Sequence, residues 1–301
     1  MDFLPNLIIP GAPKAGTSSL CEYIGRHSKV FIPKIKEPRY FIAEEILKLP
    51  ETDVQKKYLT DYSILSNTQY KKIYADRNVQ YRCDASVQYL YYHEKVIPRI
   101  KAMLDDPKII IMLRDPISRA YSNYMYLYYN NKGTFEDEIR AENKRIQDGW
   151  SSFTFFVNQG FYYDAVKDYL DSFSKVEIIL FDDFQRNPKE EIKKVFNFLE
   201  IEQIEIDTTT VYNKSGVPKN EFINWLVFQD NFLKRSTRFL YKKALNSGIR
   251  QKLTTNLRSI SVKKTKERIL PETKEMLKNL YRNDIIKLEG LIKRDLSNWM
   301  G

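Results

Sequence analysis

The sequence NLIIPGAPKAGTSSLCEYI, from Asn6 to Ile24, passes from a short apolar strand through a turn rich in glycine and proline into a helix. Gly11 and Gly16 allow the backbone of that turn to curl tightly. Successive N–H groups of such a turn, together with the positive end of the helix dipole, form a concavity that prefers phosphate or sulfate. The stretch therefore predicts a phosphate-binding loop, to which Lys14 adds a mobile positive charge.

Three hydroxyl residues follow the turn, and we predict that they cap the helix: Thr17, Ser18 and Ser19. The lysine stands two residues before Gly16, whereas the Walker A loop of ATPases and GTPases ends in Gly-Lys-Ser/Thr. This order disfavours a standard ATPase or GTPase. An ordinary strand-to-helix turn with an incidental lysine remains the alternative.

A second stretch, KIIIMLRDPISRAYSNYMYLYYN, contains the apolar run Ile109–Leu113, which is typical of an inner parallel strand. The run ends at Arg114 and passes through Pro116 into a helix that carries Ser122. A guanidinium at the strand end and a hydroxyl about two turns along the helix can converge on one phosphate. Ligands of parallel sheets bind at such strand ends, which predicts that both stretches line one crevice.

The two stretches together resemble the sulfotransferase family that uses 3′-phosphoadenosine 5′-phosphosulfate (PAPS). PKAGTSSL matches the family loop that holds the 5′-phosphosulfate, and LRDPISRAYSNY matches the one that holds the 3′-phosphate. Further similarity lies in KEPRYF (36–41), NQGFYYDAVKDYL (158–170) and ILFDDFQRNPKEEIKKVFNFL (179–199). The resemblance covers about residues 5–225.

The pattern of apolar runs predicts an α/β fold with a mostly parallel sheet. Its strands are expected near residues 6–10, 29–33, 79–83, 108–113 and 175–181. The resemblance implies a three-layer sandwich of the P-loop-NTPase-like sulfotransferase type. We expect one sulfotransferase domain over 1–301, with a nucleotide-binding core (5–225) and a basic helical C-terminal extension (226–301).

The resemblance implies PAPS as sulfuryl donor, adenosine 3′,5′-bisphosphate (PAP) as product, and no metal. The expected cofactor-binding residues are Pro13, Lys14, Ala15, Gly16, Thr17, Ser18, Ser19, Arg114, Ser122, Tyr162, Lys214 and Lys219. Lys14 and Glu37 are the expected catalytic residues, since glycosaminoglycan sulfotransferases use a glutamate in a similar segment as the base. The alternatives are a surface ion pair of Glu37 with Lys36 or Arg39, and His93 as the base. Tyr162 equally fits core packing.

One departure from the family pattern falls in DASVQYL, residues 84–90. Relatives of the glycan type carry a lysine where this chain has Ala85. Either Lys36 or Arg82 substitutes for it, or the active centre differs. Asp84 is a secondary polar candidate. Lys214 and Lys219 are alternatively ordinary solvated lysines of the loop NKSGVPKN.

The net charge of +10 belongs to one segment. Residues 234–268 hold twelve Lys/Arg and one acidic residue, a charge of +11, and the rest of the chain has 37 basic and 38 acidic residues, or −1. Apolar residues recur there at helical spacing, which predicts an amphipathic basic helix. A solvated face, an acidic-substrate surface and contact with anionic membrane lipids remain open, and we expect no nucleic-acid partner.

Cys21 and Cys83 are predicted to be reduced core residues, and two histidines are too few for a typical metal site. The sequence shows no signal peptide and no apolar run of eighteen residues, so we expect a cytoplasmic protein. Many animal members of the family carry an N-terminal membrane anchor, so the resemblance implies either a bacterial enzyme, which we favour, or a trimmed catalytic domain. The resemblance implies sulfuryl transfer to a hydroxyl or amine of a carbohydrate or glycoconjugate. An inactive PAP- or PAPS-binding module, and less so a phosphotransferase, are the alternatives.

Overall fold

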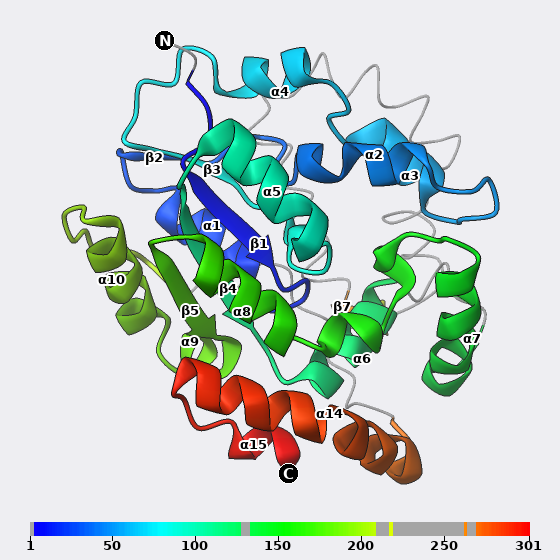
Figure 1. Cartoon of the computed structure of the whole chain (residues 1–301). Helices are drawn as coiled ribbons and strands as arrows, with labels where there is room; N and C mark the ends of the chain where they lie inside the picture. Colours follow the sequence, from blue (N-terminus) through cyan, green and yellow to red (C-terminus); the bar gives the residue numbers. More distant parts are fainter. Residues whose placement is uncertain (1–2, 128–132, 209–216, 219–261, 264–268) are drawn as a thin grey trace. The chain divides into compact units, whose positions relative to one another are not determined.

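The computed structural model describes residues 3–127, 133–208, 217–218, 262–263 and 269–301 (Figure 1). Its centre is a five-stranded sheet in the order β2-β3-β1-β4-β5, in which each pairing is parallel. The strands are β1 (Leu7–Gly11), β2 (Val30–Phe31), β3 (Tyr81–Asp84), β4 (Lys108–Leu113) and β5 (Val176–Leu180). All five coincide with the strands predicted from the sequence.

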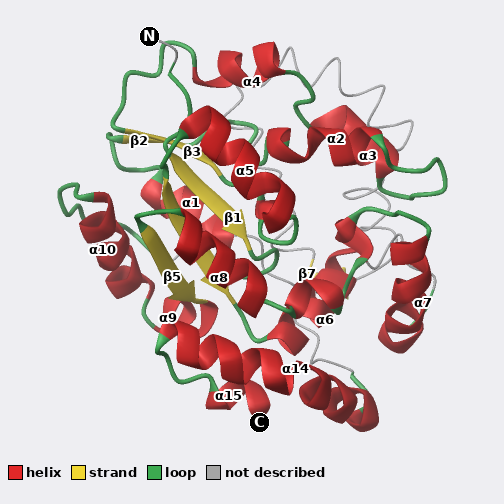
Figure 2. Ribbon diagram, viewed as in Figure 1, coloured by secondary structure: helices red, strands yellow, loops and turns green. Residues whose placement is uncertain are grey.

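Helices cover both faces of the sheet, as Figure 2 shows. Helices α5 and α8 pack together on one face, and α1 and α10 pack together on the other, which confirms the three layers (Figure 1). The bounds are α1 (Thr17–Ile24), α2 (Ala43–Leu47), α3 (Lys56–Tyr62), α4 (Asn67–Tyr74), α5 (His93–Leu104), α6 (Pro116–Leu127), α7 (Phe135–Gln147), α8 (Tyr163–Ser172), α9 (Phe181–Arg186), α10 (Pro188–Leu199), α14 (Pro271–Ile292) and α15 (Ser297–Met300).

The inner strands form the core because their side chains are apolar on both faces. Strands β1 and β4 lie side by side, and every residue from Ile109 to Leu113 is fully buried. Cys21 and Cys83 are buried and unpaired, as predicted.

Helix α14 packs against α8 and α6. The Asp284 carboxylate accepts hydrogen bonds from the backbone N–H groups of Tyr162 and Tyr163, at 2.9 and 3.2 Å, and so caps α8. The Tyr281 hydroxyl donates to the Val157 carbonyl at 2.7 Å. The predicted helical C-terminal part is therefore present.

The chain divides into two compact units, residues 1–208 with 269–301, and residues 209–268. In the second unit the described residues are β6 (Val217–Pro218) and β7 (Val262–Lys263), which pair antiparallel. The predicted boundary between residues 225 and 226 lies outside the described residues. The single domain therefore stays a prediction.

Candidate functional site

The phosphate loop joins β1 to α1 at the carboxyl edge of the sheet, where ligands of open parallel sheets bind. Lys14 and Gly16 adopt left-handed backbone angles, with φ of 67° and 92°, and Pro13 and Ala15 are buried. The φ of Gly16 favours glycine, and a Cβ atom there would lie 3.0 Å from Cδ2 of Phe181, so the space beside it is tight. Gly16 is also the N-cap of α1, so no side chain at that position competes with an anion for the first N–H groups.

The prediction that Thr17, Ser18 and Ser19 cap α1 is wrong. The left-handed turn ends at Gly16, so the three residues already belong to the helix. The hydroxyl oxygens of Thr17 and Ser18 instead accept hydrogen bonds from Nζ of Lys36, at 3.1 and 3.3 Å. Their place in the cofactor site stays a prediction.

Arg114 follows β4 and brings the second stretch to the phosphate loop. Its guanidinium donates to the Lys14 carbonyl at 3.1 Å and lies 4.7 Å from the centroid of the Phe181 ring. Tyr162 is buried, and its hydroxyl donates a hydrogen bond to the Arg114 carbonyl at 3.0 Å, which helps to fix the backbone of Arg114. Ser122 is buried in α6. The two stretches meet as expected, and the roles of these residues toward a nucleotide stay predictions.

The segment from Lys36 to Phe41 places a carboxylate between two cations beside this loop. One oxygen of Glu37 accepts a hydrogen bond from Arg39 at 2.8 Å, and the other lies 3.5 Å from Nζ of Lys36. Lys36 therefore contacts both Glu37 and the hydroxyl of Thr17. The ion pairs offered as an alternative to a catalytic Glu37 are present, but they lie beside the phosphate loop rather than apart from it.

The electrostatics of the site link the loop, the arginine and the acid. Burial lowers the pKa of Lys14 to about 8, with help from the charges of Arg114 and Lys36 and against the charge of Glu37. Burial alone would raise the pKa of Glu37, but the charges of Lys36 and Arg39 outweigh it and hold this pKa below its usual value. Lys14, Lys36 and Arg39 thus surround the ionised carboxylate of Glu37. This excess of positive charge suits an anionic ligand.

Lys36 is the cation that the geometry offers in place of the lysine missing at Ala85. The Ala85 N–H donates to the Lys36 carbonyl at 3.2 Å, so the two positions are neighbours. Arg82 is held at the other end of β3, where its guanidinium donates to the carbonyls of Leu4 and Val79 at 2.7 and 2.5 Å. Of the two candidates, Lys36 is the one that contacts the phosphate loop.

The other candidate bases have partners of their own. Asp84 is fully buried and accepts hydrogen bonds from the hydroxyls of Ser86, Tyr70 and Tyr89, at 2.6, 2.8 and 3.0 Å. Nδ1 of His93 lies 2.6 Å from the Asp168 carboxylate and ties α5 to α8. Glu37 is the candidate that lies beside the cations of the loop.

Sequence reasoning missed two aromatic neighbours of the site. Nζ of Lys14 lies 4.2 Å from the centroid of the Tyr126 ring, near the end of α6, and Phe181 packs on both Gly16 and Arg114. Phe181 directly follows β5, so its place at the carboxyl edge was predictable. Lys214, Lys219 and nearly all of 234–268 lie outside the described residues.

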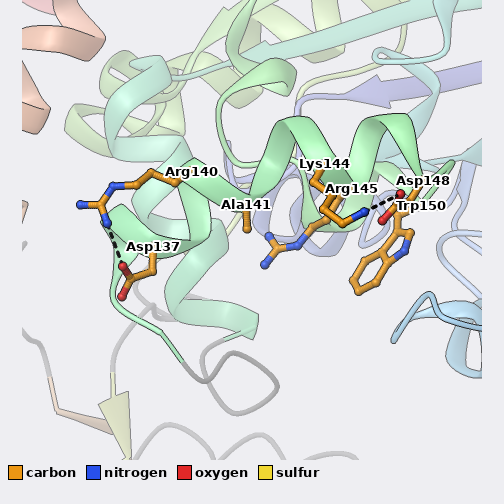
Figure 3. A pocket seen from close by; sticks show the side chains of 7 residues that line it. All are labelled: Asp137, Arg140, Ala141, Lys144, Arg145, Asp148 and Trp150. Atoms are coloured by element: carbon orange, nitrogen blue, oxygen red, sulfur yellow. Dashed lines mark hydrogen bonds and ion pairs between the residues drawn. The ribbon is translucent and has the colours of Figure 1, made fainter.

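A shallow pocket of about 510 Å³ runs along α7, and Figure 3 shows its lining. Two of its cations pair with acids on the same stretch, Arg140 with Asp137 and Lys144 with Asp148, each at 3.0 Å. None of the predicted site residues lines this pocket. It therefore adds nothing to the site built around Lys14.

A left-handed glycine turn with cations beside it, at the carboxyl edge of a parallel sheet, is typical of α/β proteins of the phosphate-loop class. A family model described as the sulfotransferase domain matches residues 4–288. The chain belongs to the sulfotransferase family, and its predicted family and fold class are confirmed.

Known relatives agree with this assignment. A solved sulfotransferase from Alicyclobacillus acidocaldarius has a TM-score of 0.74 with 27% identity over 99% of both chains. Carbohydrate sulfotransferase 15 of Mus musculus is 23% identical over 246 residues, 66% of this chain and 44% of that protein. Heparan sulfate glucosamine 3-O-sulfotransferase 3B1 of Homo sapiens is 26% identical over 224 residues, 71% of this chain and 51% of that protein. The chain spans about half the length of these curated relatives.

Two of the expected absences concern metals and membranes. Across the described ranges, no cluster of three or more His, Cys, Asp or Glu is placed to hold a metal ion. Among the helices that the structure describes, none has the length and apolar character needed to span a membrane. Metal independence and cytoplasmic location both stay predictions.

Proposed function

We propose that this chain is a PAPS-dependent sulfotransferase that moves a sulfuryl group to a hydroxyl or amine of a carbohydrate or glycoconjugate. The observation that carries the proposal is the meeting of Lys14, Lys36, Arg114 and Glu37 at one anion-binding turn. The printed names of two relatives, a carbohydrate and a heparan sulfate sulfotransferase, support a glycan acceptor.

The residues at the turn fit the donor. A Cβ atom at Gly16 would fill the space beside Phe181, and the surrounding cations match a ligand with several phosphate or sulfate groups. The N–H groups from Lys14 to Ser19 would hold the 5′-phosphosulfate, and Arg114 with Ser122 the 3′-phosphate.

PAPS supplies an activated sulfuryl group joined through oxygen to its 5′-phosphate. Glu37, kept ionised by Lys36 and Arg39, accepts the proton of the attacking hydroxyl or amine. The bond from that atom to sulfur forms while the bond from sulfur to the bridging oxygen breaks, which leaves PAP. Lys14 and Lys36 stabilise the negative charge on the bridging oxygen and on the transferring group.

Glu37→Gln tests this assignment and separates an enzyme from a binding module. We expect transfer from labelled PAPS to chemically desulfated heparin to fall by about 10²- to 10⁴-fold, the usual contribution of a positioned base. PAP affinity, measured by calorimetry, should stay within about twofold, because other residues hold the nucleotide. Glu44→Gln is the control, since that exposed carboxylate of α2 pairs with Arg99 of α5.

Three results would overturn parts of the proposal. An unchanged rate in Glu37→Gln would remove Glu37 as the base. PAP binding without transfer by the wild-type protein would favour the inactive module that the loss of lysine at Ala85 first suggested. Stronger stabilisation by ATP–Mg²⁺ than by PAP in a thermal-shift assay would favour a phosphotransferase.

Contact of 234–268 with an acidic substrate or an anionic membrane, and a cytoplasmic location, remain part of the proposal.

A further inference from the structure

Three aromatic rings form a group at the surface that we call the aromatic platform: the exposed rings of Tyr58 and Tyr62 and the half-buried ring of Phe153. Tyr58 and Tyr62 lie one turn apart on α3, with side chains 41% and 55% exposed and ring centroids 5.1 Å apart. The ring of Phe153 lies 6.4 Å from that of Tyr58, although it comes from a distant part of the chain. Exposure of several large aromatic rings to water is unfavourable, so such a group at a surface commonly marks a place where a ligand binds.

The platform is joined to the candidate base by one side chain. The guanidinium carbon of Arg39 lies 5.7 Å from the centroid of the Tyr58 ring and 5.3 Å from that of Phe153. The same guanidinium donates to the Glu37 carboxylate at 2.8 Å. Arg39 is itself only 6% exposed, so its charge is held between the rings and the acid. The rings and the candidate base are therefore neighbours of one and the same side chain, that of Arg39.

The charges around the platform favour a ring over a charged group as its ligand. Lys57 pairs with Asp61 at 3.2 Å on the same helix, and Lys56 pairs with Glu51 at 2.7 Å. Arg39 is paired with Glu37. These described cations near the platform are thus neutralised by acids of their own. A sugar ring offers an apolar C–H face for stacking on an aromatic ring and polar edges that stay in water.

We propose that Tyr58, Tyr62 and Phe153 form an acceptor subsite in which a sugar ring stacks beside the hydroxyl or amine that Glu37 deprotonates. This inference rests on the proposed function, because it takes Glu37 as the group that deprotonates the acceptor. The proposed subsite would select acceptors that carry a sugar ring. Its residues lie on α3 and at position 153, apart from the phosphate loop.

The test uses Tyr62→Ala and, as the conservative variant, Tyr62→Phe, which keeps the ring. Ile286→Ala on α14 is the matched control, since its side chain is 52% exposed and Tyr62 is 55% exposed. An unsulfated heparin-type hexasaccharide is titrated by calorimetry into each protein saturated with PAP, a complex that cannot turn over. We expect Tyr62→Ala to weaken hexasaccharide binding about three- to tenfold, the range for loss of one aromatic stacking contact. Tyr62→Phe and Ile286→Ala should stay within about twofold of the wild type.

Binding of PAP alone by the same variants separates this inference from the proposed function. PAP affinity should be unchanged in Tyr62→Ala, and acceptor KM should rise with kcat retained. Hexasaccharide affinity that is equal in Tyr62→Ala and wild type, or absent in both, overturns the subsite. A phenolic acceptor that loses affinity in Tyr62→Ala while the hexasaccharide does not would also overturn it, in favour of an aromatic substrate. Failure of the wild type to bind PAP would instead defeat the proposed function.

Discussion

The loop from Gly11 to Gly16 and the segment from Lys36 to Phe41 meet at one site, but different parts of the protein hold them. The loop continues β1, which pairs with β3 and β4, and its backbone is fixed by further backbone bonds. The Ala12 N–H donates to the Met112 carbonyl at 2.6 Å. The second segment follows β2, a strand of only two residues, and has no such ladder beneath it.

Two separate backbone bonds, from Ala85 N–H to the Lys36 carbonyl at 3.2 Å and from Ile64 N–H to the Pro38 carbonyl at 2.8 Å, hold the second segment together with side chains. The Arg39 N–H donates to the Ser86 hydroxyl at 2.9 Å, and the Phe41 N–H donates to the Tyr89 hydroxyl at 3.2 Å. Both hydroxyls in turn donate to the buried carboxylate of Asp84. The first loop, the proposed nucleotide side, thus depends mainly on backbone geometry, while the second segment, the proposed acceptor side, depends in addition on one buried acid and two hydroxyl groups.

Arg114→Ala is expected to have the largest effect on the nucleotide side. Removing one partner of a buried charge pair should weaken PAP binding by about 2–4 kcal/mol, roughly 30- to 900-fold. Calorimetry with PAP measures the change, and Arg186→Ala, an exposed residue of α9, serves as control. Adenosine 5′-phosphosulfate, which lacks the 3′-phosphate, should bind poorly to both proteins. Equal PAP affinity in Arg114→Ala and wild type would contradict this assignment.

Lys14→Ala should lower turnover by on the order of 10²-fold while PAP affinity falls less, because the ammonium acts mainly on the leaving group. Single-turnover transfer from labelled PAPS gives the rate, and calorimetry gives the affinity. Unchanged transfer would mean that the loop is structural and that Lys36 supplies the charge by itself.

The sequence was sufficient for the strands and the first turn of the predicted nucleotide side because its signals are local. The apolar run Ile109–Leu113 predicted β4, and Gly11 and Gly16 predicted the tight turn between β1 and α1, whose binding of an anion stays a prediction. Even there, the capping role of Thr17 was wrong, because the left-handed turn at Gly16 moves the helix start. The link from Arg39 to Ser86 joins residues 47 positions apart, and no local pattern indicates such a contact.

Ser86→Ala sharpens the comparison on the acceptor side, with Tyr70→Phe as its matched control. Both hydroxyls donate to Asp84, but Ser86 also accepts from the Arg39 N–H of the Glu37 segment. Each change should cost about 1–3 kcal/mol of unfolding free energy in urea titrations, the usual penalty for leaving a buried partner unsatisfied. We expect kcat to fall about tenfold, or 1.4 kcal/mol, in Ser86→Ala only, with PAP affinity unchanged in both. Equal kcat in the two variants would reduce the Asp84 network to a purely structural role.

The smallest predicted effect is the pH dependence of PAP binding, and it arises on the nucleotide side. The free protein holds the pKa of Lys14 at about 8, below its usual value, and a bound phosphate anion should raise it again. Binding therefore takes up a proton above pH 8, so PAP affinity should fall as pH rises, by roughly tenfold from pH 7 to pH 9.

Neighbouring groups make this effect assignable to Lys14. Glu37 has a lowered pKa and stays ionised from pH 7 to pH 9, and Arg114 stays protonated. The second pKa of the PAP phosphates is about 6, which lies below this range. Lys36 also faces Lys14, so a variant must identify the titrating group. Lys14→Arg keeps its charge and should give an affinity that is nearly flat from pH 7 to pH 9. Calorimetry in buffers of different ionisation enthalpy measures the proton uptake directly. A flat profile in the wild type, or a slope that persists in Lys14→Arg, would place the titration elsewhere.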